Sequence, residues 1–350
     1  MQVKYKTVKC KKVLGNLAVF ATRFWTKKSF DPYIGCELSC VYCNTGISPT
    51  SSSEKNSPTV FVKVDAPEVL RKELEMLKRK IVLNMGVAVD PYQPAEEKYQ
   101  VTRRILEVLN KYKCPFALGT KSDLILRDLD ILSEASKKLH CCVALSITTL
   151  NEKLAKLLEP NSPTPKRRLM AVRELSNSGV MVGIWLTPII PFITDDNENI
   201  TEVVKAAKEN GAKFILGGAL DMRAPQKTRK FLEKYFPKYL HCYEKLYMLE
   251  SDGPTYYPVD SYLYNLYKRF ISICQEQGVE CFIPHFSSLR QALLFYLRNF
   301  AKFKGTPVFE LTQILNYLPI SQDIFQITQI KHGNNVLAKG FLKAFRYFPH

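Results

Sequence analysis

The sequence contains no long apolar run. Its most apolar stretch, residues 182–193, is interrupted by Thr187 and by two prolines, whereas a membrane-spanning helix needs about 20 consecutive, mostly apolar residues. The first twelve residues also lack the apolar core of a secretory signal peptide. These two absences predict a cytoplasmic protein that does not associate with a membrane.

The regular cysteine spacing of a disulfide-stabilised scaffold is also missing. The ten cysteines are spread over 350 residues without a repeated interval, so we expect them to stay reduced. Hydrophobic residues make up 46% of the chain and charged residues 24%, which is an ordinary globular composition. This length accommodates one large α/β domain with a smaller appendage, or two domains.

Acidic residues are absent from the first 30 residues, which carry eight lysines and arginines. The last 61 residues hold a net charge of +6, so the two ends supply most of the net charge of +17 and the middle 259 residues only +3. Such a concentration favours a polyanionic partner, most simply nucleic acid. The alternative is a solvated surface in a lysine-rich proteome.

Helical and strand-like segments alternate from residue 66 onwards. Apolar runs of strand length follow amphipathic helices in five places, and we expect strands at 81–90, 115–122, 141–148, 180–190 and 213–220. Because these strands are almost continuously apolar, both of their faces should be covered, as in a parallel sheet with helical crossovers. With residues 30–35 as a first strand, the chain has six β/α units. We therefore predict an α/β fold, a partial TIM-type (β/α)6 barrel with a C-terminal helical extension.

The pattern changes after residue 221, and we divide the chain into four parts. They are a basic N-terminal segment at 1–29, the barrel at 30–221, a tyrosine-rich helical part that completes the core at 222–285, and a small basic appendage at 286–350. In the third part Tyr239, Tyr243 and Tyr247 recur at the i, i+4 interval of one helix face. Such a stripe can stack on nucleic-acid bases, although it more often packs in a core.

Polar residues follow several of these strands, where barrels of this type place their chemistry. A cysteine-rich loop at 36–43 follows the first strand. Later strands end at further polar residues, namely Asp90, Tyr92, Lys121, Ser122, Ser146 and Thr148. Because the carboxyl ends of parallel strands meet at one edge, these side chains should share one face. Two simpler interpretations are that Asp90 caps a turn before Pro91 and that Lys121 pairs with an acid such as Asp90.

The loop "CELSCVYC" (36–43) carries Cys36, Cys40 and Cys43 at C-x3-C-x2-C spacing. A tight loop can direct three thiolates at one metal centre. A structural zinc would need a fourth protein ligand, and the remaining cysteines and histidines show no C-x2-C or H-x3-H pattern that would supply one. An iron–sulfur cluster held by only three cysteines would leave one iron open to an exogenous ligand.

The same loop, with an aromatic residue before its last cysteine, resembles the cluster loop of the radical S-adenosylmethionine (radical SAM) enzymes. The resemblance implies that Cys36, Cys40 and Cys43 bind a 4Fe–4S cluster and that S-adenosylmethionine occupies the fourth iron. Reductive cleavage of that cofactor would give methionine and a 5′-deoxyadenosyl radical, which abstracts hydrogen from a substrate. An electron donor such as ferredoxin or flavodoxin is implied as a partner. The sequence indicates no oligomeric state.

The resemblance also implies roles for several of the polar residues at the strand ends. Tyr42 would offer a backbone contact to the adenine, and Lys121 would pair with the carboxylate of the cofactor. Ser146 would bind its ribose or its methionyl end, and Thr148 would also bind the cofactor. Asp90 and Tyr92 should face the same pocket and are candidates for catalysis. Asp90 is also a candidate for cofactor binding.

Longer segments, at 90–109, 119–132 and 146–180, resemble the spore photoproduct lyase-like branch, whose members are often labelled DNA repair photolyases. Two positions depart from that lyase. Val87 stands where the lyase has a hydrogen-returning cysteine, and Asn44 follows the third cluster cysteine, where the lyase has a tyrosine.

We therefore expect a radical SAM enzyme with a macromolecular substrate. The basic ends favour nucleic acid, and the two departures argue against repair of a thymine dimer by the lyase mechanism. One alternative is a radical SAM enzyme that acts on a protein or a small molecule. The other is a non-catalytic, zinc-containing nucleic-acid-binding protein.

Overall fold

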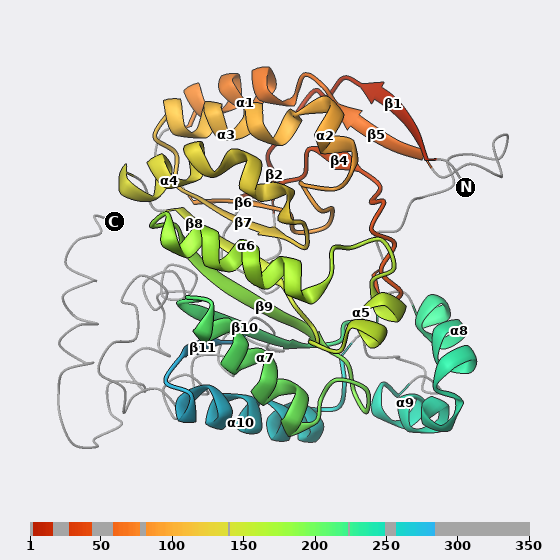
Figure 1. The fold of residues 1–350 in the computed structure, drawn as a ribbon. Helices are drawn as coiled ribbons and strands as arrows, with labels where there is room; N and C mark the ends of the chain where they lie inside the picture. Colours follow the sequence, from red (N-terminus) through yellow and green to blue (C-terminus); the bar gives the residue numbers. More distant parts are fainter. Residues whose placement is uncertain are drawn as a thin grey trace, which may run out of the picture.

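A mostly parallel sheet forms the centre of the fold. The computed structural model describes residues 3–16, 28–43, 59–77, 82–138, 141–222, 225–248 and 257–283. Within them eight strands pair in the order β11-β10-β9-β8-β7-β6-β3-β2 (Figure 1). In chain order these are β2 (Gly15–Asn16), β3 (Lys28–Phe30), β6 (Leu83–Met85), β7 (Phe116–Thr120), β8 (Cys141–Ser146), β9 (Met181–Ile189), β10 (Phe214–Ala219) and β11 (Glu280–Phe282). Neighbouring strands are parallel except β2 and β3, which are antiparallel.

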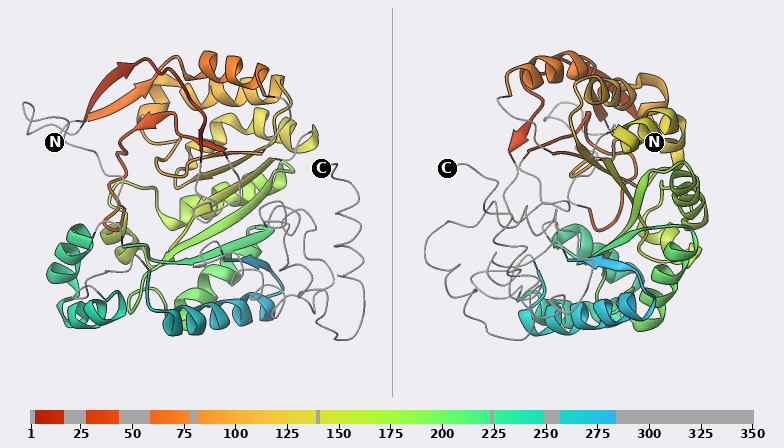
Figure 2. Two further views of the ribbon diagram at one scale, coloured as in Figure 1. Left: turned by 180° about the vertical axis from the view of Figure 1, so that it is seen from behind. Right: turned by 90° about the vertical axis from the view of Figure 1, so that its left-hand side faces the viewer.

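The sheet is curved, and helices cover its convex side (Figure 2). The covering helices are α1 (Ala66–Glu75), α3 (Val101–Lys111), α4 (Leu129–Lys138), α6 (Pro165–Asn177), α7 (Asn197–Glu209) and α10 (Asp260–Glu276). In the described residues β2 and β11 do not pair with each other, so the sheet is not closed. The architecture is a partial barrel.

The two faces of this sheet differ in composition. In β7, Phe116 and Leu118 belong to the hydrophobic core beneath the helices, so Ala117 and Gly119 face the concave side, because side chains alternate along a strand. A Cβ on Gly119 would meet the ring of Trp185 from β9 at 1.8 Å. The concave face therefore combines small residues with one indole that lies across the strands.

The six predicted β/α units are confirmed as the parallel strands β3, β6, β7, β8, β9 and β10 with their helices. The boundary predicted for the first strand was wrong. The strand in the main sheet ends at Phe30, and Tyr33–Ile34 form β4 in a second sheet of order β1-β5-β4, with β1 at Lys4–Val8 and β5 at Thr59–Lys63. Pro32 lacks the N–H that would continue the ladder, so the chain leaves the main sheet before the cysteine loop.

Shorter helices occupy the connections at the carboxyl ends of the strands. They are α2 (Ala95–Tyr99), the 3-10 helix η1 (Asp123–Asp128), α5 (Glu152–Leu158), α8 (Pro225–Tyr235), the 3-10 helix η2 (Pro237–Tyr239) and α9 (Leu240–Leu246). Helix α4 follows η1 without a break. The hydroxyl of Ser122 accepts a hydrogen bond from the Leu124 N–H at 3.2 Å, and this cap starts the tight turn of η1.

Two tyrosines of the predicted stripe pack in the core. Tyr243 and Tyr247 are fully buried, and their hydroxyls donate to the carbonyl oxygens of Pro191 at 2.8 Å and Leu220 at 3.0 Å. These two rings are therefore inaccessible to bases, in agreement with the packing interpretation.

No helix in the described ranges is both long and apolar enough to cross a membrane. The predicted appendage at 286–350 and residue Asn44 lie outside the described residues. The division into four parts stays a prediction.

Candidate active site

The cysteine loop (residues 36–43) holds three neighbouring thiols. Cys36 and Cys40 are buried and Cys43 is half-buried. Burial raises the pKa of Cys36 to about 12, and the charges of Asp90 and Cys40 add to the effect. Burial also raises the pKa of Cys40 to about 11, opposed by Lys121. Buried thiols that repel one another as thiolates lose their protons readily only when a cation binds them. Such thiols, close together in one loop, are therefore suited to a metal centre.

A buried polar clamp fixes the shape of this loop. The Gln93 side chain accepts a hydrogen bond from the Glu37 N–H at 3.0 Å and donates to the Gly35 carbonyl at 3.1 Å. The carboxylate of Glu37 accepts from the Ala95 N–H at 2.8 Å and from the Tyr5 hydroxyl at 2.8 Å. Strand β1, helix α2 and the cysteine loop are thereby joined around one buried carboxylate.

A second clamp lies under the other half of the loop. The buried hydroxyl of Tyr42 donates to Glu159, whose second oxygen lies 2.5 Å from a guanidinium nitrogen of the equally buried Arg168. Arg168 donates in turn to the Ser146 carbonyl at 2.8 Å. The Val41 N–H donates to the Leu158 carbonyl at 2.9 Å. This chain of contacts ties the cysteine loop to the end of α5 and to the exit of β8.

Asp90 connects the ends of β6 and β7. Its carboxylate accepts hydrogen bonds from the Tyr92 N–H at 2.9 Å, the Thr120 hydroxyl at 2.6 Å and the Lys121 N–H at 2.7 Å. The first of these is the turn cap before Pro91 that the sequence offered as the simpler interpretation. Asp90 therefore positions the backbone that carries Lys121.

Lys121 lies beside the cysteine loop. Its Nζ is 5.8 Å from the centre of the Tyr42 ring. Its charge opposes the rise in the pKa of Cys40 and helps to lower the pKa of Glu159. The structure thus brings Lys121, Tyr42 and the cysteines together. An ammonium at this place can attract an anionic ligand group.

Ser146 and Thr148 are buried at the end of β8, on the same edge of the sheet as the cysteine loop. Tyr92 is placed differently. Its ring is buried and its hydroxyl donates to the buried Asp128 at 3.0 Å, so burial and this carboxylate raise its pKa well above the ordinary value. The hydroxyl of Tyr92 therefore belongs to a network beneath η1.

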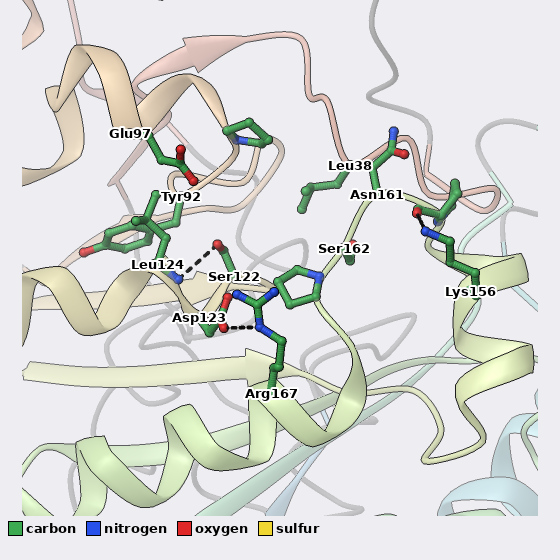
Figure 3. Close-up of a pocket in the computed structure, with 13 residues that line it drawn as sticks. Leu38, Tyr92, Glu97, Ser122, Asp123, Leu124, Lys156, Asn161, Ser162 and Arg167 are labelled. Carbon is green, nitrogen blue, oxygen red and sulfur yellow. Dashed lines mark hydrogen bonds and ion pairs between the residues drawn. The ribbon is translucent and has the colours of Figure 1, made fainter.

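A cavity of about 530 Å³ borders the loop at Leu38 and the exit of β7 at Ser122 (Figure 3). Its wall includes the ion pair between Arg167 and Asp123, whose atoms lie 2.6 Å apart. No cysteine is among its described lining residues. The cavity therefore lies alongside the cysteine loop, which contributes Leu38 to its wall.

Comparison with known proteins identifies the superfamily. A family model described as the radical SAM superfamily matches residues 31–207, just over half of the chain. The chain belongs to the radical SAM superfamily. An uncharacterized protein of Mycobacterium tuberculosis is 27% identical to it over 257 residues, covering 70% of this chain and 74% of the relative. An uncharacterized protein of Methanocaldococcus jannaschii is 29% identical over 213 residues, covering 61% of this chain and 77% of the relative.

Among solved structures, spore photoproduct lyase complexed with dinucleoside spore photoproduct is similar with a TM-score of 0.60. The similarity covers 81% of this chain and 82% of that chain at 15% sequence identity, so it shows a common fold. The radical SAM partial barrel expected from the sequence is thereby confirmed, and the protein is an enzyme of this superfamily. The superfamily implies a 4Fe–4S cluster and S-adenosylmethionine.

The cysteine loop of this radical SAM enzyme fits a cluster better than a single ion. In the part of the chain that the structure describes, no three His, Cys, Asp or Glu side chains converge as one metal ion requires. A zinc ion draws all its ligands to one point, whereas a cluster takes each thiolate on a separate iron atom. The described part of the cysteine loop offers three neighbouring thiols, and this donor set fits the cluster that the superfamily implies.

Sequence reasoning missed several residues of the radical SAM site. Gln93, Glu159 and Arg168 form the two clamps, and Lys227 of α8 donates to the carbonyl oxygens of Cys40 and Cys43. The buried amide of Asn84, on β6, has no hydrogen-bond partner among the described residues. The position of Asn84 between two apolar residues of a strand was the one available signal, because an amide in such a run needs an explanation.

Proposed function

We propose that this radical SAM enzyme binds a 4Fe–4S cluster through Cys36, Cys40 and Cys43 and uses it to act on a nucleic acid. The observation that carries the proposal is the cysteine loop, in which three adjacent thiols, two of them buried, are clamped from both sides. When bound, the cluster and S-adenosylmethionine would supply a 5′-deoxyadenosyl radical for hydrogen abstraction. Ferredoxin or flavodoxin is the proposed class of electron donor.

The polar residues around the loop would bind and orient the cofactor. The Lys121 ammonium, beside Tyr42, would pair with the carboxylate of S-adenosylmethionine, and the Tyr42 backbone would contact its adenine. Ser146 and Thr148, buried at the end of β8, would contact the ribose or the methionyl end. Asp90 would act by positioning Lys121, to whose N–H its carboxylate is bonded. Since its hydroxyl is bound to Asp128, Tyr92 would contribute the face of its ring.

Two observations support a nucleic-acid substrate. The net charge of +17 is concentrated at the two ends of the chain, as expected for a polyanionic partner. A lyase of the same fold is solved in complex with a dinucleoside, and a variant of it with AdoMet as well. Val87 takes the place of the cysteine that dimer repair needs, so we propose a different hydrogen abstraction on nucleic acid.

Anaerobic purification of the full chain tests the proposal. The protein should contain about four iron and four sulfide per chain and show visible absorption that bleaches with dithionite. Substitution Cys40→Ala should abolish both the cluster and the release of 5′-deoxyadenosine from S-adenosylmethionine. The control Cys242→Ala, at a half-buried thiol outside the loop, should retain them. A colourless protein that holds one zinc would overturn the proposal. An iron–sulfur protein that modifies only a peptide or a small molecule would overturn its substrate.

A further inference from the structure

Helix α8 carries a row of lysines along one side. Lys227, Lys230 and Lys234 stand at i, i+3 and i+7, which places them on one face of the helix. The adjoining face is buried through Thr228, Phe231 and Leu232. Lys230 and Lys234 are exposed, so the row points away from the core.

This row begins at the cysteine loop. The Nζ of Lys227 donates to the Cys40 carbonyl at 2.6 Å and lies 3.3 Å from the Cys43 carbonyl. In both Figure 1 and Figure 2, α8 and α9 project from the edge of the sheet at which α5 also lies. A ligand lying along α8 would therefore be led to the loop that carries the cysteines.

The lysines that follow Lys227 have no acidic partner among the described residues. Lys230, Lys234 and Lys238 are exposed, and none takes part in a described ion pair. Glu233 and Glu244 are bound to Arg229 at 3.1 Å and 3.6 Å. Among the described residues, the surface formed by α8 and η2 therefore carries an excess of positive charge.

Aromatic rings lie between these lysines. Tyr235 is 41% exposed and has the Lys234 ammonium 4.9 Å from its ring centre, while Lys238 lies 4.8 Å from the ring centre of Tyr239. Phe192, 37% exposed, stacks on Tyr239 with ring centres 5.4 Å apart.

The backbone of Phe192 has a φ of +62°, a conformation that is unfavourable for a bulky residue and that recurs at functional sites. Exposed rings interleaved with cations are how proteins hold single-stranded nucleic acid.

We propose that Lys230, Lys234 and Lys238, with the rings of Tyr235 and Phe192, bind a single-stranded segment of the nucleic-acid substrate. We call this surface the α8 face. The inference rests on the proposed function and adds where the substrate binds: the lysines contact consecutive phosphates, and the rings stack on bases as the strand approaches the cysteine loop. The positive charge would also attract an acidic redox protein, but such a protein has no bases to stack on the exposed rings.

The salt dependence of binding tests the α8 face. The full chain is titrated with a fluorescein-labelled single-stranded DNA oligonucleotide of mixed sequence at several salt concentrations. Each neutralised phosphate of a single strand contributes about 0.7 to the slope of log K against log salt concentration. The variant Lys230→Gln/Lys234→Gln/Lys238→Gln should therefore show a slope that is shallower by about 2. The variant Tyr235→Ala should weaken binding with an unchanged slope.

A matched control removes the same charge elsewhere. The variant Lys111→Gln/Lys205→Gln/Lys268→Gln alters exposed lysines of α3, α7 and α10 and should keep the slope of the natural protein.

Equal slopes in the two triple variants would overturn the α8 face. So would a triple α8 variant that keeps its DNA slope but is reduced more slowly by reduced flavodoxin, because the face would then serve a redox protein. The iron content of every variant is measured as a separate readout. If the natural protein contains no iron, the proposed function is overturned but the α8 face is not.

Discussion

At the scale of single residues, the site depends on charges that are buried in pairs. Glu159 and Arg168 are both fully buried and lie 2.5 Å apart, under the hydroxyl of Tyr42. Burial alone would raise the pKa of Glu159, but the charges of Arg168 and Lys121 outweigh it and hold the pKa below its ordinary value. Removing one member of such a pair leaves the other charge uncompensated in the core.

Substitution Glu159→Gln should lower the free energy of unfolding by about 3 kcal/mol at neutral pH, measured by urea denaturation. The double variant Glu159→Gln/Arg168→Met should be less destabilised than the sum of the two single variants, because it leaves no unpaired charge. Additive losses would contradict this account.

The same pair predicts a pH dependence. A folded pKa below that of the unfolded chain means that the carboxylate stabilises the fold above about pH 4.3 and loses this contribution as the pH falls through the folded pKa. Denaturation curves of Glu159→Gln should therefore depend less on pH in the acid range than those of the natural protein. Parallel pH profiles would show that Glu159 does not act in this way.

Lys227 acts on the loop from outside the barrel. Its ammonium, bonded to the Cys40 carbonyl, should favour the reduced and more negative state of a cluster held by this loop. Lys227→Met should shift the midpoint potential, followed by electron paramagnetic resonance, to more negative values. Lys230→Met, one turn along the same helix, should leave it unchanged. A shift of equal size in both variants would indicate a general effect of charge.

These residue-scale contacts could not be predicted from the sequence, because they join distant positions. Tyr42 and Glu159 are 117 residues apart, and Lys227 and Cys40 are 187 apart. Only the loop itself is local, with three cysteines in eight residues, and its prediction needed no knowledge of the fold.

At the scale of elements, local signals set most of the boundaries. Helix α7 begins where the Asp196 side chain accepts a hydrogen bond from the Asn199 N–H at 2.8 Å, and α6 begins at Thr164 followed by Pro165. Both are start signals that can be read from sequence. Strand β4 could not be read in this way, because its partner β5 lies beyond the cysteine loop.

Substitution Asp196→Ala should cost about 1 kcal/mol of stability, because it leaves helical N–H groups without their cap. The conservative variant Asp196→Asn keeps an accepting oxygen and should cost only a small part of this. Thermal unfolding followed by circular dichroism measures both. An equal loss in the two variants would point to the charge of Asp196 in place of its hydrogen bond.

At the scale of the whole molecule, the cysteine loop is a point at which separate parts of the chain meet. Hydrogen bonds join it to β1, to α2, to the end of α5 and to α8. A group that binds the three thiols would therefore stabilise contacts on several sides of the barrel at once, and binding to the folded state alone raises its stability.

Removal of the cluster tests this dependence. Protein reconstituted anaerobically with iron and sulfide should melt at a higher temperature than the same protein after chelation of its iron. Cys40→Ala should show no such difference. If reconstitution leaves the melting temperature of the natural protein unchanged, the loop is rigid without its metal.

The contact of Lys227 with the cysteine loop also bears on how much of the chain is needed to hold this loop in place. The superfamily match stops at residue 207, yet α8 begins at Pro225 and places an ammonium against the backbone of two cysteines that lie inside the match. A fragment cut at residue 221 would keep the whole of this match and lose a contact to the cysteine loop. The matched segment is therefore smaller than the part of the chain that shapes the loop, and a truncated protein made for cluster reconstitution should extend through α8.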